Sequence, residues 1–235
     1  MAKEPKQFNA LPKHIAIIMD GNRRWAKNRG KSPEFGHREG YKRFIEIGEV
    51  CRKMGIKTLT VYAFSTENWK RKKEEVDCLI DLLRTAIKRE TKRVNKENIR
   101  IRILGRKEDL PDDLRETIKK SEQDTENNTS GNLNIALSYG GRAEIVNTIK
   151  SIIKSKIKPE EITEKLIQNN LYTKGQDDPD LIIRCGGEKR LSNFLLWQSA
   201  YAELYFSDIL WPDFNEGELY KALNYFSNVK RNFGE

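Results

Sequence analysis

The stretch HIAIIMDGNRRWA, residues 14–26, is the most informative part of this chain. An apolar run rich in isoleucine, His14–Met19, passes directly into Asp-Gly-Asn and then into a segment of helical character. A short, continuously apolar run of this kind is typical of a buried strand in a parallel sheet. The stretch therefore predicts a strand, a tight loop and a helix, with polar side chains gathered at the loop.

Five further apolar runs are spaced along the chain: Thr58–Phe64, Ile99–Leu104, Leu133–Ser138, Leu181–Arg184 and Ala202–Phe206. Between them, Phe35–Met54 and Glu75–Val94 carry apolar residues at helical spacing, and Pro111 with two following aspartates opens another helix. This alternation predicts one α/β domain, residues 1–235, with a roughly six-stranded, mostly parallel sheet covered by helices. Residues 1–12 are expected to be flexible.

The composition excludes several other classes of protein. With 37% hydrophobic and 9% aromatic residues, the chain is not a disordered polymer. Its longest segment without a charge, residues 127–141, falls short of the ~20 apolar residues that cross a bilayer. A secretory signal and paired CxxC cysteines are both missing from the sequence. We therefore expect a cytoplasmic protein without a disulfide scaffold or a Cys/His zinc site.

The positive charge lies in the first part of the chain. Residues 1–100 carry 25 basic and 13 acidic side chains, a net charge of +12, whereas the remainder carries −3. Such a field attracts nucleic acids, anionic lipid surfaces or small polyphosphates. One alternative is therefore an RNA-binding protein that uses Trp25 and Trp69 for base stacking.

The loop after the first predicted strand contains Asp20, Gly21, Asn22, Arg23 and Arg24. In an open α/β sheet, ligands bind beyond the carboxyl ends of the strands. Glycine allows close approach of the backbone to a ligand, and a helix N-terminus suits phosphate oxygens. A carboxylate beside a phosphate site indicates Mg²⁺ between them, with Asp20 as a ligand. The alternative is an ordinary helix start that leaves the arginines solvated.

Two later loops carry similar chemistry. After the second strand, Ser65, Asn68 and Arg71 offer three kinds of polar group to an anionic ligand, and Trp69 offers an apolar wall. The neighbouring lysines are expected to be solvated. After the fifth strand, two glycines separate Arg184 from the segment that contains Arg190 and Ser192. Two arginines and a hydroxyl form a suitable clamp for a diphosphate.

Three other residues stand out. His37 is one of only two histidines and lies close to the first loop, where it is either a donor to phosphate or incidental. His14 and Cys185 are predicted to be structural. Glu203 stands among aromatic residues, where a buried carboxylate is costly unless it is paired or bound to metal. It is the candidate second acidic group.

Five motifs together resemble the cis-prenyltransferase family, and within it the undecaprenyl diphosphate synthases of bacteria. They are HxxxxMDGNRRWA at 14–26, GHxxG at 36–40, YAFSTENWxR at 62–71, IRxGGExRxSNFLLWQxAYAELYF at 183–206 and LWPDF at 210–214. Together they extend over most of the chain. Nucleotide-binding motifs, in contrast, fail on spacing: Gly30-Lys31-Ser32 lacks the first glycine of a P-loop.

The resemblance implies a Mg²⁺-dependent homodimer that condenses isopentenyl diphosphate with an allylic diphosphate, farnesyl diphosphate. The implied product is a long Z-polyprenyl diphosphate, undecaprenyl diphosphate, which is a lipid precursor for the cell wall. The resemblance also implies a hydrophobic tunnel for the growing chain, transient contact with the inner membrane face for product release, and no nucleic acid partner. A non-catalytic prenyltransferase subunit is a further alternative.

The resemblance assigns roles to individual residues. Asp20 and Asn68 would be catalytic, although an amide is a poor base, so we expect Asn68 to orient a water molecule or a diphosphate oxygen. Asp20 and Glu203 would hold Mg²⁺. The residues that would contact the substrates are Gly21, Asn22, Arg23, Arg24, Trp25, His37, Ser65, Thr66, Glu67, Trp69, Arg71, Arg184, Arg190, Leu191 and Ser192.

Overall fold

The structure is a computed structural model that describes residues 8–231. Its strands are β1 (His14–Ile18), β2 (Thr58–Ser65), β3 (Ile99–Leu104), β4 (Gly131–Tyr139), β5 (Leu181–Arg184) and β6 (Glu203–Phe206). They form one sheet in the order β3-β4-β2-β1-β5-β6, and every neighbouring pair is parallel. The predicted sheet is thus confirmed, and each predicted run ends within two residues of the observed strand.

Strand β1 lies between β2 and β5, and all five of its residues are buried. The side chains of Ile15 and Ile17 belong to the larger hydrophobic core, whereas Ala16 and Ile18 belong to a smaller core on the other face of the sheet. A strand that is covered on both faces needs no polar side. Its sequence is therefore an unbroken apolar run.

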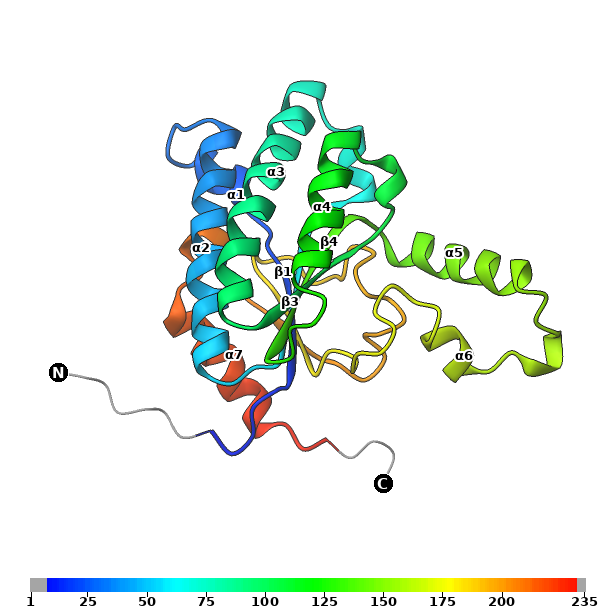
Figure 1. The fold of residues 1–235 in the computed structure, drawn as a ribbon. Coiled ribbons are helices and arrows are strands. Elements are labelled where there is room, and N and C mark those ends of the chain that lie inside the picture. Colours follow the sequence, from blue (N-terminus) through cyan, green and yellow to red (C-terminus); the bar gives the residue numbers. More distant parts are fainter. Residues whose placement is uncertain (1–7, 232–235) are drawn as a thin grey trace.

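The larger core lies beneath four helices, α2 (Pro33–Lys53), α3 (Lys73–Lys96), α4 (Asp112–Asp124) and α7 (Glu216–Asn228). Figure 1 shows α2, α3 and α4 side by side over the sheet. The opposite face is covered by the chain around Phe194 and Leu195, where the Phe194 ring stacks on Tyr62 at 4.6 Å. The predicted helices over 35–54 and 75–94 are confirmed.

Three shorter or peripheral helices complete the fold. Helix α1 (Asn22–Lys27) follows the β1 loop, and α5 (Gly141–Lys154) with α6 (Glu164–Gln168) forms an arm that extends from the body (Figure 1). Within residues 8–231, no helix combines the length and the apolar character that crossing a bilayer requires.

The segment expected to be flexible, residues 1–12, lies partly outside the described residues. Within the described part, the Phe8 ring packs against Tyr220 of α7 at 6.1 Å. The backbone N–H of Asn9 donates a hydrogen bond to Oγ of Ser227 at 2.9 Å. Residues 8 and 9 therefore lie along α7.

Two glycines of α2 allow α1 to approach closely. A Cβ atom at Gly36 would lie 2.2 Å from the carbonyl oxygen of Asn22, and one at Gly40 would lie 2.1 Å from Asn22 Oδ1. The carbonyl of Gly40 also accepts a hydrogen bond from Nε1 of Trp211 at 2.8 Å. The position of Asn22, which starts the helix after the β1 loop, therefore depends on glycine at two successive turns of α2.

Substitution Gly40→Ala is expected to lower the free energy of unfolding by about 1–3 kcal/mol, the usual range for overpacking, because Asn22 must move. The matched control is Gly48→Ala in the same helix, where the nearest atom to a new Cβ would be Leu59 Cδ2 at 3.8 Å. Alanine there should stabilise the helix by up to ~1 kcal/mol. Urea unfolding of both variants checks this, and equal stabilities would contradict it.

Candidate active site

The loops that follow β1, β2 and β5 meet at one edge of the sheet. These strands are neighbours and parallel, so their carboxyl ends lie side by side. Ile18 pairs in register with Tyr62 of β2 and with Arg184 of β5. The residues just beyond these positions surround two adjoining pockets.

The first pocket has a volume of about 680 Å³ and is strongly basic. Five of its lining residues are lysine or arginine, against the single carboxylate of Asp20. The predicted residues in its lining are Asp20, Gly21, Asn22, Arg23, Arg24, His37 and Arg71. Arginine and lysine bind phosphate oxygens through charge-assisted hydrogen bonds, so this pocket suits a diphosphate.

The second pocket has a volume of about 560 Å³ and shares part of its wall with the first. It extends from the β1 loop across the end of β2 to the β5 loop. The predicted residues in its lining are Asp20, Asn22, His37, Ser65, Glu67, Asn68, Arg71, Arg184 and Ser192. The two pockets together therefore gather residues from three loops that are far apart in the sequence.

A third, apolar cavity of about 100 Å³ lies between α2, α3 and the sheet. Its lining includes Tyr41, Phe44, Leu83 and Ile87, and it shares His37 with both polar pockets. The cavity thus begins where the two polar pockets meet.

Arg184 connects the β5 loop to the β1 loop. It is only 3% exposed. Its Nη2 donates to Asp20 Oδ2 at 2.9 Å, and its Nη1 donates to Ser192 Oγ at 2.7 Å and to the carbonyl of Arg190. Asp20 Oδ1 lies 3.4 Å from Nη2 of Arg24. Because a buried guanidinium must be partnered, Arg184 fixes the Asp20 carboxylate between the two pockets.

The chain after β5 has an unusual backbone. Ser192, Asn193 and Leu195 have φ values of +49°, +66° and +45°, in the left-handed region that side chains other than glycine rarely adopt. The Asn193 carbonyl accepts a hydrogen bond from the Gly141 N–H at 2.7 Å, and its side chain donates to Glu67 Oε1 at 2.9 Å. These contacts hold the strained segment in place and keep Ser192 against the guanidinium.

Hydrogen bonds between nearby side chains and backbone groups hold the turn that follows β2. The Ser65 N–H donates to Asn68 Oδ1 at 3.0 Å, and Arg71 Nη1 donates to Glu75 Oε1 at 2.8 Å. Glu75 also lies 3.5 Å from Nη1 of Arg23. The Asn68 oxygen thus acts as a hydrogen-bond acceptor within the turn, an arrangement that suits a positioning role.

His37 is a buried imidazole shared by both pockets. Its Nε2 has no hydrogen-bond partner within residues 8–231, and Glu75 Oε1 is 3.9 Å away. Burial of the ring, together with the neighbouring Arg71, lowers the pKa of His37 to about 4. The ring is therefore neutral at pH 7, and its buried Nε2 keeps an unused hydrogen-bonding position at the wall of both pockets.

Some predicted contact residues line neither pocket within the described part of the chain. Trp25 stacks on Phe35 at 6.1 Å, and its Nε1 donates to Asp213 at 2.7 Å. Trp69 Nε1 donates to Ser138 Oγ at 2.9 Å. The remaining members of this group are Thr66, Arg190 and Leu191. Both tryptophan rings thus serve the fold, and the structure gives no support for base stacking on them.

Glu203 does not share a site with Asp20 within this chain. It is the first residue of β6 and pairs with Leu181 at the start of β5, whereas Asp20 lies beside Arg184 at the end of β5. Its Oε1 lies 3.8 Å from Nε of Arg231. The expected joint magnesium site is therefore not formed within the chain, because the strand register places the two carboxylates at opposite ends of the sheet.

The fit of a magnesium ion rests on Asp20. Within residues 8–231 there is no cluster of three or more His, Cys, Asp or Glu side chains that could hold a metal. Mg²⁺ is, however, commonly bound by one or two carboxylates together with substrate phosphates. The Asp20 side chain is 32% exposed and lines both pockets. It fits a metal ion that is shared with a bound diphosphate.

Several lining residues were not predicted as contacts. Lys27 lies in the first pocket, and Tyr62 and Asn193 lie in the second. Lys27 follows the arginine pair in the sequence, so the basic cluster was the available signal. Glu75 lines neither pocket but pairs with Arg23 and Arg71, which do. Its sequence position indicates only a helix start and gave no signal for these contacts.

A basic pocket and an adjoining polar pocket that open onto an apolar cavity suit the class of enzyme that brings together two diphosphates, one with a hydrocarbon tail. The model of the undecaprenyl diphosphate synthase family matches residues 18–234. The chain belongs to this family of cis-prenyltransferases, and the resemblance inferred from the motifs is confirmed.

Three relatives illustrate the similarity. An isoprenyl transferase of Clostridium perfringens is 49% identical, over 95% of this chain and 90% of the relative. A tritrans,polycis-undecaprenyl-diphosphate synthase (geranylgeranyl-diphosphate specific) of Thermococcus kodakarensis is 47% identical, over 95% and 87%. The crystal structure of lavandulyl diphosphate synthase from Lavandula x intermedia with dimethylallyl diphosphate has a TM-score of 0.91 at 36% identity, and the match covers 96% of this chain and 99% of the other.

His37→Gln is expected to flatten the acid side of the stability profile. The unfolded chain binds a proton at His37 near pH 6.5 and the folded chain only near pH 4, so the free energy of unfolding falls as pH decreases from about 6.5 to about 4. The slope from one such group is at most ~1.4 kcal/mol per pH unit. Urea unfolding at pH 7, 6 and 5 measures it.

Burial also lowers the pKa of His14. This residue contributes to the pH dependence of the free energy of unfolding in the unaltered protein and in His37→Gln alike. The difference between the two profiles therefore reports His37 alone. An unchanged slope in the variant would show that the histidine does not stay neutral in the folded protein.

Proposed function

We propose that this enzyme condenses isopentenyl diphosphate with farnesyl diphosphate and repeats the step to give undecaprenyl diphosphate. The observation that carries the proposal is the 2.9 Å contact between Asp20 and Arg184, which joins the β1 loop to the β5 loop at the wall shared by the two pockets. The apolar cavity adjoins the same wall at Asn22 and His37. A relative at 47% identity is named for geranylgeranyl diphosphate. That diphosphate is therefore the alternative primer.

The first pocket is suited to the allylic diphosphate. Arg23, Arg24, Lys27 and Lys31 place positive charge around the leaving group, where negative charge grows as the allylic C–O bond breaks. Preorganised charges of this kind lower the barrier because they need no reorientation during the reaction. When bound, Mg²⁺ would add to this charge as a Lewis acid, held by Asp20 together with diphosphate oxygens.

The second pocket is suited to isopentenyl diphosphate. Arg184 and Ser192 would bind its head group, and a shared wall at Asp20 and His37 would bring its double bond beside the allylic carbon. The new carbon–carbon bond forms as the allylic C–O bond breaks, and loss of a proton from the isopentenyl unit completes the step. Holding the two reactants in the correct orientation accounts for much of the rate acceleration.

The hydrocarbon tail would enter the apolar cavity between α2 and α3. Burial of each CH₂ group contributes ~0.8 kcal/mol, so a growing tail gains free energy as it leaves water. His37 lies at the junction of the cavity and both pockets. The tail would therefore start next to the reacting centre.

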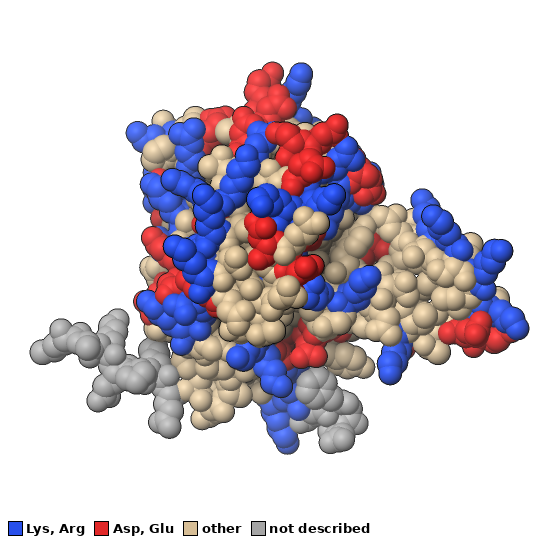
Figure 2. All heavy atoms as spheres, in the orientation of Figure 1, with Lys and Arg blue, Asp and Glu red and all other residues tan. Residues whose placement is uncertain are grey.

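We also expect a cytoplasmic homodimer that contacts the inner membrane face to release its product. Three apolar residues on α5 are exposed, Val146 at 49%, Ile149 at 47% and Ile153 at 68%, and the spacing places them on one side of the helix. Figure 2 shows that the middle of the α5–α6 arm is largely uncharged. Such a surface is suited to a second copy of the chain. Sedimentation velocity measures its oligomeric state.

Asp20→Ala is expected to reduce turnover more than about 100-fold, the scale for losing a key charge-stabilising group. The assay measures incorporation of labelled isopentenyl diphosphate into products primed with farnesyl or geranylgeranyl diphosphate, with Mg²⁺ and then with a chelator. Asp112→Ala is the matched control, since this aspartate is highly exposed at the start of α4. We expect it to leave turnover unchanged.

Near-normal turnover of the Asp20 variant would refute its role. Failure of the unaltered protein to incorporate isopentenyl diphosphate with either primer would favour a non-catalytic subunit. Steeply salt-dependent RNA binding in that case would favour the nucleic-acid alternative.

A further inference from the structure

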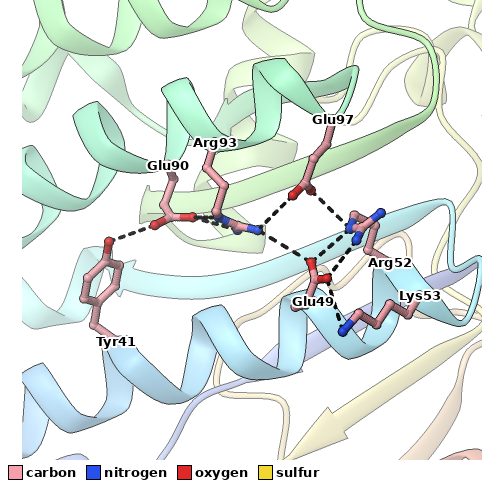
Figure 3. Close-up of polar contacts among 7 residues, drawn as sticks. All are labelled: Tyr41, Glu49, Arg52, Lys53, Glu90, Arg93 and Glu97. Atoms are coloured by element: carbon pink, nitrogen blue, oxygen red, sulfur yellow. Dashed lines mark hydrogen bonds and ion pairs between the residues drawn. The ribbon is translucent and has the colours of Figure 1, made fainter.

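Two glutamate side chains are buried within residues 8–231, Glu90 at 4% and Glu144 at 1% exposed. Glu90 is paired with Arg93, which donates to its Oε2 at 2.7 Å (Figure 3). In the same part of the chain, Glu144 has no cationic partner and is held by neutral donors. Burial of a carboxylate is costly unless its oxygens are hydrogen-bonded, so the fold depends on these donors.

The hydrogen bonds of Glu144 join distant segments of the chain. Its Oε2 accepts from Tyr139 Oη at 2.5 Å, at the end of β4, and its Oε1 accepts from the backbone N–H of Tyr172 at 2.8 Å. Gln198, between β5 and β6, donates from Nε2 to Oε1 at 3.2 Å and to Oε2 at 3.1 Å. Burial raises the pKa of Glu144, and these donors offset part of the rise. One carboxylate therefore ties β4 and α5 to the segments before and after β5.

The first turn of α5 connects Glu144 to the second pocket. The backbone N–H of Gly141 donates to the Asn193 carbonyl at 2.7 Å, and that of Arg142 donates to Asn193 Oδ1 at 2.9 Å. Both donors lie within three residues of Glu144. Asn193 and the preceding Ser192 line the second pocket. A shift of the start of α5 would therefore move the wall of this pocket.

A second connection passes through Tyr139. Its backbone carbonyl accepts from Tyr62 Oη at 3.1 Å, and the same hydroxyl lies 3.4 Å from the carbonyl oxygen of Ser192. Tyr62 also lines the second pocket. Because Ser192 has a left-handed backbone, its conformation must be maintained by its surroundings. Contacts of Glu144 thus reach this segment from two sides.

We propose that Glu144 is a positioning residue, and that its carboxylate keeps Ser192 and Asn193 in the arrangement that binds isopentenyl diphosphate. This inference rests on the proposed function, which assigns the second pocket to that substrate. Within residues 8–231, Glu144 lines neither polar pocket, so it acts through α5 and Gln198. Neither Ser192 nor Asn193 lines the first pocket in that part of the chain, so binding of the allylic diphosphate should not depend on Glu144.

Glu144→Gln tests the role of the carboxylate. A carboxylate only accepts hydrogen bonds, whereas an amide presents its NH₂ group to at least one of the donors around it. We expect the KM for isopentenyl diphosphate to rise at least tenfold, because a buried donor loses its acceptor and the segment shifts. The KM for farnesyl diphosphate should change less than twofold and kcat less than threefold. Initial rates of the first condensation measure these constants.

Thr148→Val is the matched control. Thr148 is buried one turn further along α5, and its Oγ1 donates to the carbonyl of Asn170 at 3.3 Å. Valine removes this hydrogen bond but leaves the contacts of Asn193 unchanged. All three kinetic constants should therefore stay within twofold of those of the unaltered enzyme.

Tyr139→Phe provides a milder variant if Glu144→Gln does not fold. It removes one neutral donor to the carboxylate, so we expect the KM for isopentenyl diphosphate to rise about fivefold, the scale of one hydrogen bond. Thermal unfolding by circular dichroism verifies that each variant is folded.

A binding measurement separates this inference from the proposed function. Calorimetric titration with isopentenyl diphosphate alone, and with farnesyl diphosphate alone, requires no turnover. In Glu144→Gln the Kd for isopentenyl diphosphate should rise at least tenfold and that for farnesyl diphosphate less than twofold. An unchanged Kd for isopentenyl diphosphate in the folded variant, or an equal loss of both affinities, would overturn the positioning role even if the unaltered enzyme is active. An unaltered protein that does not condense the two substrates, in a pair of proteins that shows the expected binding difference, would refute the function and retain the positioning role.

Discussion

The buried guanidinium of Arg184 is the constraint on which the site depends. It stands at the end of the interior strand β5, nearly without contact with water, and a charge in that position must be neutralised and hydrogen-bonded. Within residues 8–231 its two terminal nitrogens have partners, and only its Nε has none. Its partners come from the β1 loop, through Asp20, and from the strained chain after β5, through Ser192. Satisfying one side chain thus fixes the positions of two loops that the sequence separates by more than 150 residues.

The sequence predicted those parts of the fold that depend on local pattern. The β1 run is apolar because both of its faces are buried, and amphipathic spacing identified α2 and α3. The polar loops were predicted because the carboxyl ends of parallel strands meet. The predicted run Ala202–Phe206 already places Glu203 at the start of a strand, at the edge of a parallel sheet opposite to the β1 loop, and the observed register agrees. Its pairing with Asp20 was implied only by the family resemblance. The sequence could not show that Glu75 lies beside His37, a contact formed only when α3 packs against α2.

Helices α2 and α3 serve both the head-group site and the tail path. The first turns of these helices bring His37 to both polar pockets with Glu75 beside it, and their middle turns supply Tyr41 and Glu90 to the wall of the apolar cavity. The ends of the two helices are joined by the ion pairs Arg52–Glu97 and Arg93–Glu49. One pair of helices therefore provides a polar entrance and an apolar middle, the order of head and tail in a prenyl diphosphate, followed by a charged far end.

The order of strands has a consequence for synthesis on the ribosome. Strand β1 is made first, yet one of its two neighbours is β5, whose register partners begin at Leu181. Until that segment leaves the exit tunnel, the nascent chain presents an apolar strand with an open hydrogen-bonding edge. Such edges are aggregation-prone, and distant pairing slows folding. The strand that carries the β1 loop thus keeps one unpaired edge during most of translation, which is the kind of exposure that chaperones protect.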